Sequence, residues 1–225
     1  MSHYLSASWP EETFGHFIPF VGRRYEEGLE GVGRVLVLGE SHYDEDYETS
    51  FHLSQRDYTQ RIGKLMESKG EGRYSTPFFR KLDQALTGQQ SPNVVEAADA
   101  WSRIAFANFI PQFVGKDAKA AKLKMHWQEA NRVFPSLINQ LCPNVILVLG
   151  LTTWRQLAAG ERTEWSSYVP KANETRWPKA RDIWRMRYEG GYALSTWVYH
   201  PSWPFDGWKA MSGTLRHLIQ CRLAI

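Results

Sequence analysis

Three short apolar runs constrain the fold of this chain more than any other feature. They lie at Arg34–Leu38, Ile104–Phe109 and Val145–Leu149, and polar and apolar residues do not alternate within them. Such runs are typical of strands that are buried on both faces, as in a parallel sheet covered by helices. A hairpin is predicted further along, because Ile183–Tyr188 and Tyr192–Tyr199 flank the turn sequence Glu-Gly-Gly.

Helical patterns separate these strands. They are found at Arg56–Glu67, Pro77–Leu86, Asp117–Leu141, Thr152–Ala159 and Trp208–Arg222. Strands that alternate with helices indicate an α/β fold. We therefore expect a three-layer α/β/α sandwich with a central, mostly parallel four-stranded sheet. The sequence shows no domain boundary, so residues 1–225 are predicted to form one domain, in which the segment 41–76 is an insertion or lid.

Three local patterns add detail to this outline. Residues 11–30 can form an amphipathic helix with charges on one side. The sequence Ser91-Pro-Asn-Val-Val predicts a helix that is capped by Ser91 and has Pro92 in its first position. Pro135 is expected to break the long helix predicted at Asp117–Leu141, because proline lacks the N–H that a helix interior requires.

The composition limits the class of protein. No run approaches the ~18 apolar residues of a membrane helix, and the first residues lack the pattern of a signal peptide. We therefore expect a cytoplasmic protein with no membrane contact. Two cysteines, Cys142 and Cys221, suit a reducing compartment and are too few for a four-cysteine cluster. The net charge of +3 permits nucleic-acid binding without requiring it.

Two polar motifs directly follow predicted strands. The first is Gly39-Glu-Ser-His-Tyr43 and the second is His200-Pro-Ser-Trp-Pro-Phe205. Ligands of an open parallel sheet bind where the carboxyl ends of the strands meet. We therefore expect Glu40, His42 and His200 to converge in one cleft. A carboxylate and an imidazole in such a cleft are suited to acid–base chemistry.

Asn108 stands near the end of an apolar strand. A buried amide without partners costs about 1–3 kcal/mol. The edge of a nucleic-acid base supplies such partners, because an amide offers both a donor and an acceptor. A cap of the following turn is the alternative role for Asn108. The chain also contains 10 tryptophans, and exposed aromatic rings among basic residues suit base stacking as well as the covering of small satellite cores.

Five segments, taken in order, resemble the uracil-DNA glycosylase superfamily. Val35–Tyr43 is similar to its first strand and water-activating loop, and Pro77–Leu86 to the segment that stacks a ring on the extruded base. Phe106–Pro111 resembles the strand that carries a base-reading asparagine. Val145–Trp154 resembles the third strand and the helix after it, and Tyr199–Trp203 resembles the His-Pro-Ser loop.

This resemblance implies a DNA glycosylase, a hydrolase of base excision repair that flips uracil or another damaged base out of DNA and cleaves its N-glycosidic bond. The catalytic residues would be Glu40 and His200. The residues at the base would be Gly39, Ser41, Tyr43, Phe78 and Asn108. The residues at the DNA would be Ser202, Trp203 and Phe205. The partner would be duplex or single-stranded DNA, the protein would be a monomer, and no metal or cofactor would be required.

Several positions depart from the superfamily patterns. Ser41 stands where one branch carries its catalytic Asp, whereas Glu40 matches a Glu of the branch that holds an iron–sulfur cluster. His42 and Tyr43 replace the Pro-Gly of that branch. Tyr43 matches the position at which other members use a tyrosine to exclude a 5-methyl group. Because of these departures, the identity of the target base stays open.

Two alternative functions follow from the same residues. One is a nucleic-acid-binding protein that has kept the fold and lost the chemistry. The other is a serine-type hydrolase in which His42 or His200 activates Ser41. For the second, the sequence Gly39–Tyr43 resembles the nucleophile elbow G-x-S-x-G. Tyr43, however, occupies the last glycine position of that motif and would crowd its tight turn.

Overall fold

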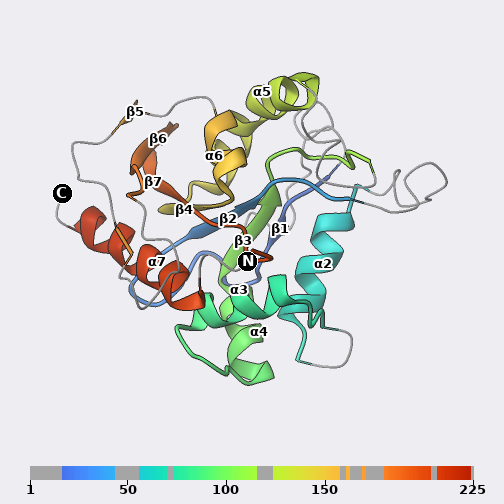
Figure 1. Ribbon diagram of the computed structural model, residues 1–225, viewed down its shortest axis with the longest axis vertical. Helices are drawn as coiled ribbons and strands as arrows, with labels where there is room; N and C mark the ends of the chain where they lie inside the picture. The colour runs from blue at the N-terminus through green and yellow to red at the C-terminus, as the bar shows by residue number, and fades with distance from the viewer. Residues whose placement is uncertain are drawn as a thin grey trace.

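One mixed sheet separates two layers of helices in this protein (Figure 1). The computed structural model describes residues 17–43, 56–69, 73–115, 124–157, 161–162, 169–170, 180–203 and 207–223. The strands are β1 (Phe20–Val21), β2 (Val35–Gly39), β3 (Ile104–Asn108), β4 (Val145–Leu149), β5 (Glu161–Arg162), β6 (Trp184–Tyr188) and β7 (Gly191–Val198). The helices are α2 (Tyr58–Glu67), α3 (Pro77–Thr87), α4 (Val94–Ser102), α5 (Lys124–Leu141), α6 (Leu151–Gln156) and α7 (Trp208–Leu223).

The sheet is larger than the sequence predicts. Its seven strands follow the order β1-β3-β2-β4-β7-β6-β5, and the predicted α/β class is confirmed. The strands β3, β2, β4 and β7 are parallel and form the centre. The predicted total of four strands is wrong, because β6 extends the sheet as the antiparallel partner of β7. The two-residue strands β1 and β5 are too short to leave a pattern in the sequence.

The strands of the centre are buried on both faces, as their apolar runs predict. Leu36 and Leu38 of β2 pack with α5 on one face of the sheet. Val35 and Val37 point to the other face, where they pack with α3, α4 and α7. The alternation follows from the two-residue period of a strand. Figure 1 shows the same division, with α5 and α6 on one side of the strands and α3, α4 and α7 on the other.

The helical part of the segment 41–76 belongs to the folded core. Helix α2 packs against β1 and α4, and the side chain of Met66 is completely buried. This part is therefore packed into the rest of the fold. Residues 44–55 and 70–72 of the segment lie outside the described residues.

Three local predictions differ from the structure. Residues 17–30, predicted as helical, form β1 and a series of turns, because Pro19 and Gly28 interrupt them and Gly28 has a φ of +67°. Helix α4 is capped by Asn93 and not by Ser91, since the Asn93 side chain accepts hydrogen bonds from the N–H groups of Val95 and Glu96. Helix α5 continues through Pro135.

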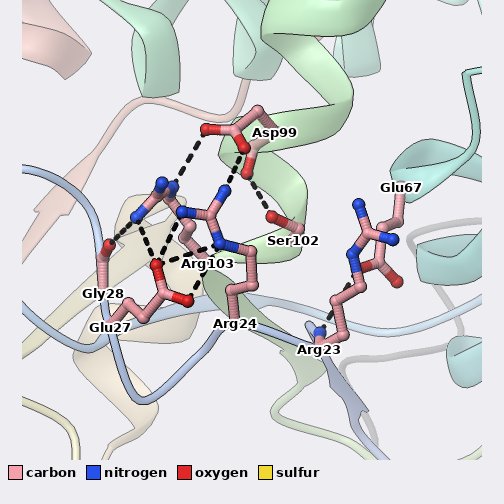
Figure 2. A network of polar contacts seen from close by, with 8 residues as sticks. All are labelled: Arg23, Arg24, Glu27, Gly28, Glu67, Asp99, Ser102 and Arg103. Atoms are coloured by element: carbon pink, nitrogen blue, oxygen red, sulfur yellow. Dashed lines mark hydrogen bonds and ion pairs between the residues drawn. The ribbon is translucent and has the colours of Figure 1, made fainter.

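A network of ion pairs ties the turn before β2 to the end of α4 (Figure 2). Arg24 binds the carboxylate of Glu27 through Nε at 2.9 Å and Nη2 at 2.6 Å, and it also contacts Asp99. Arg103 binds Asp99 at 2.9 Å and Glu27 at 3.2 Å. These residues precede β2 and β3 and therefore lie at the amino-terminal edge of the parallel strands, beside a cavity of about 950 Å³.

Candidate active site

The carboxyl ends of the four parallel strands form the edge at which polar side chains gather. Glu40 directly follows β2, Asn108 ends β3, Gly150 follows β4 and His200 follows β7 by two residues. From β2 the chain continues to β3 on one side, whereas from β4 it continues to β7 on the other side. The topological switch point, the usual ligand site of an open α/β sheet, therefore lies between β2 and β4. Glu40 stands beside it.

Two hydroxyl groups fix the carboxylate of Glu40. Tyr43 Oη donates a hydrogen bond to Glu40 Oε1 at 2.7 Å. Thr153 Oγ1 approaches Glu40 Oε2 at 3.5 Å. Thr153 is buried in the first turn of α6, which begins where Gly150 adopts a φ of +116°. The turn after β4 therefore helps to orient a side chain at the end of β2.

Asn108 lies directly over Gly39. The two residues are register partners in β3 and β2, and a Cβ atom on Gly39 would lie 2.2 Å from Asn108 Oδ1. Glycine at position 39 therefore permits the close approach of the amide. Asn108 is 8% exposed, and its side chain makes no hydrogen bond to another residue within the described ranges. Its amide places one donor and one acceptor at this edge of the sheet.

The imidazole of His200 is held in one tautomer. The backbone N–H of Ser202 donates to His200 Nδ1 at 3.3 Å, so Nδ1 is unprotonated and Nε2 carries the hydrogen. Burial and the positive charge of Lys81 lower the pKa of His200 to about 4. The ring of Phe78 lies 5.2 Å from the His200 ring. At neutral pH the group is therefore an uncharged hydrogen-bond donor beside an aromatic ring.

The turn after His200 exposes an aromatic side chain. The backbone N–H of Trp203 donates to His200 O at 2.8 Å, and the Trp203 residue is 56% exposed. Ser202 is exposed in the same turn. Phe205, predicted to contact DNA, lies outside the described residues.

His42 does not join the predicted cleft. Its Nε2 atom is hydrogen-bonded to Thr59 Oγ1 at 2.8 Å, and its ring packs among Phe17, Tyr58 and Phe113 at centroid distances of 5.2, 4.8 and 5.9 Å. Burial in this aromatic surrounding lowers the pKa of His42 to about 3. The residue is therefore neutral and half-buried, and it packs against the aromatic side chains at the edge of the core.

The geometry of Ser41 does not favour the serine-hydrolase alternative. Its Oγ atom is buried and has no hydrogen-bond partner among the described residues. The neighbouring imidazole of His42 is bonded to Thr59 instead. A nucleophilic serine needs a base within hydrogen-bond reach.

Glu40 and His200 approach the edge from opposite faces of the sheet. Glu40 contacts Thr153 of α6, whereas His200 contacts Phe78 of α3. The strand β4 lies between β2 and β7. Two strand spacings of about 4.8 Å therefore separate the strands that carry the two groups.

Two site residues were not predicted from the sequence. Thr153 contacts Glu40, and its signal is the Gly-Leu-Thr-Thr sequence at the carboxyl end of a buried strand. Lys81 contacts the turn after His200, with Nζ donating to Trp203 O at 2.7 Å. Lys81 follows Phe78 by three residues on one helix. This spacing places both side chains on the same face and could have indicated the contact from the sequence.

The sequence has no detectable similarity to known proteins that bears on this site. No model of a known protein family matches the sequence, and no curated protein is detectably similar to it. Within the described ranges, no helix is long and apolar enough to cross a membrane. The same residues contain no group of three or more His, Cys, Asp and Glu side chains arranged to hold a metal ion. The candidate site consequently rests on its own geometry.

Proposed function

We propose that the protein is a DNA glycosylase that hydrolyses the N-glycosidic bond of uracil or another modified base. The observation that carries this proposal is the gathering of Glu40, Asn108 and His200 at the carboxyl edge of the parallel strands β2, β3 and β7 of one sheet. Each group has a chemical character suited to one part of the reaction. The resemblance to the uracil-DNA glycosylase superfamily points to the same residues.

Recognition of the base would use an aromatic ring and an amide. A base inside a duplex is inaccessible, so it is flipped out at a cost of a few kcal/mol. Phe78 stacks on the flipped base, and the Asn108 amide pairs with its hydrogen-bonding edge. Trp203, which is 56% exposed, fills the gap in the duplex.

The chemical step breaks the bond between C1′ of the deoxyribose and the base nitrogen. The departing base takes the bonding electrons and leaves as an anion, which accepts a hydrogen bond from Nε2–H of His200. The oxygen of a water molecule forms the new bond to C1′, and the Glu40 carboxylate accepts the proton of that water. The carboxylate also stabilises the positive charge that develops on the sugar.

The test measures base release from oligonucleotides that each carry one lesion. Alkali cleaves the abasic site that a glycosylase leaves, so shortened strands report activity. We expect E40Q and H200A to reduce kcat by roughly 10²–10³ with little change in DNA affinity, because both residues act on charge that develops in the transition state.

The alternative functions give different results in the same experiment. A binding protein without chemistry shifts the mobility of DNA and leaves no alkali-labile site on any lesion. A serine-type hydrolase reacts with a fluorophosphonate probe at Ser41. Full activity of E40Q or H200A on a cleaved lesion would exclude the proposed mechanism.

A further inference from the structure

Lys81 links two parts of the candidate site that are distant in the sequence. It lies on α3, one turn after Phe78, and its Nζ atom donates to the backbone carbonyl of Trp203 at 2.7 Å. We propose that Lys81 is a positioning residue that holds the His200–Trp203 turn against α3, and that its ammonium group opposes protonation of the His200 imidazole. A role of Lys81 in catalysis rests on the proposed function, whereas its contact with the turn does not.

The contacts make α3 and the turn a single unit. Two side chains of α3 contact the turn. The Phe78 ring lies 5.2 Å from the His200 ring, and the Lys81 ammonium group donates to Trp203 O. Within the turn, Ser202 N–H donates to His200 Nδ1 and Trp203 N–H donates to His200 O. Loss of the Lys81 contact therefore removes one hydrogen bond that ties the Trp203 backbone to α3.

The charge of Lys81 acts on His200 in a defined direction. A nearby cation disfavours a second positive charge on an imidazole, and burial acts in the same direction. Among the described residues, the charge that acts on the pKa of His200 is that of Lys81 on α3. Lys209 in the first turn of α7 lies over the Trp208 ring instead.

An uncharged imidazole is the useful form at this position. With Nδ1 occupied by the Ser202 N–H, the neutral ring carries its hydrogen on Nε2 and can donate it. A base anion that leaves beside it gains a hydrogen bond without a change in the protonation of the enzyme. The ammonium of Lys81 further stabilises negative charge in this region.

The test is an NMR titration of the His200 ring in the full-length protein, with its signal assigned by its loss in H200Q. The variants are K81Q, which keeps a hydrogen-bond donor without the charge, K81M, which removes both, and K81R, which keeps both. The control is K64Q on the exposed surface of α2. We expect K81Q and K81M to move the titration midpoint upward by roughly 0.5–1 pH units. K81R and K64Q should leave it in place.

A second measurement separates this inference from the proposed function. If the protein releases a base, the acid limb of its pH–rate profile should move upward in K81Q by the same amount as the NMR midpoint. If no lesion is cleaved, the proposed function fails while the NMR titration still tests Lys81. An unmoved His200 midpoint in folded K81Q, or an equal shift in K64Q, would overturn the inference.

Discussion

The imidazole of His42 makes the stability of this protein depend on pH. Its pKa is lowered from 6.5 to about 3 because the ring packs among Phe17, Tyr58 and Phe113. Between these two pH values the unfolded chain binds a proton at this residue and the folded protein does not. Stability therefore rises with pH through this window and is lost as the pH falls below about 6.5.

The expected magnitude follows from the difference in pKa. Each unit corresponds to 1.36 kcal/mol, so at pH 5 the linkage at His42 removes about 2 kcal/mol of the free energy of unfolding. His200, whose pKa is lowered to about 4, has the same sign and a similar effect at pH 5. The substitution H42Q keeps a polar group near Thr59 but cannot be protonated. Its stability should therefore fall by about 2 kcal/mol less than that of the wild type between pH 7.5 and pH 5.

Urea unfolding at pH 7.5, 6.5, 5.5 and 5.0 measures this difference. The matched control is T59V, which removes the hydrogen bond to His42 and leaves the imidazole in place. T59V should lower stability by about 1 kcal/mol at every pH without changing the pH dependence. Equal losses in the wild type and in H42Q over this range would refute the argument.

Three further predictions concern the candidate site. G39A should lower both stability and base recognition, because its Cβ would lie 2.2 Å from Asn108 Oδ1. Chemical denaturation measures the loss of stability, and the ratio of rates on different bases measures the change in recognition. Y43F should reduce base release roughly tenfold through loss of the hydrogen bond to Glu40 Oε1, and single-turnover kinetics on one lesion measure it; unchanged kinetics would assign Tyr43 to packing alone. W203A should slow cleavage of duplex DNA much more than cleavage of single strands, since single strands need no wedge; equal slowing would contradict that role.

The layered architecture was accessible from the sequence because long-range burial leaves a strong pattern. The continuous apolar runs at β2, β3 and β4 reflect helices on both faces of the sheet. The end of a helix is a weaker signal. The sequence before α4 offers two N-cap residues, Ser91 and Asn93. Asn93 is the cap because Glu96, three residues after it, completes a reciprocal pair of hydrogen bonds.

The position of the candidate site was also predictable, whereas the direction of its side chains was not. Parallel strands place Glu40, Asn108 and His200 at one edge wherever their side chains point. The turn after β2 directs His42 toward Thr59 of α2 and returns Tyr43 to Glu40. These directions depend on packing against α2 and on contacts across the sheet, which no local pattern encodes.

The approach of Glu40 and His200 from opposite faces of the sheet has a stereochemical consequence. In the proposed reaction, a water molecule activated by Glu40 would attack from the side of α6, and a base bound by His200 would leave on the side of α3. Such an in-line displacement at C1′ would invert the anomeric carbon. A second, covalent displacement by Glu40 is not needed, and the first sugar product should carry the α configuration.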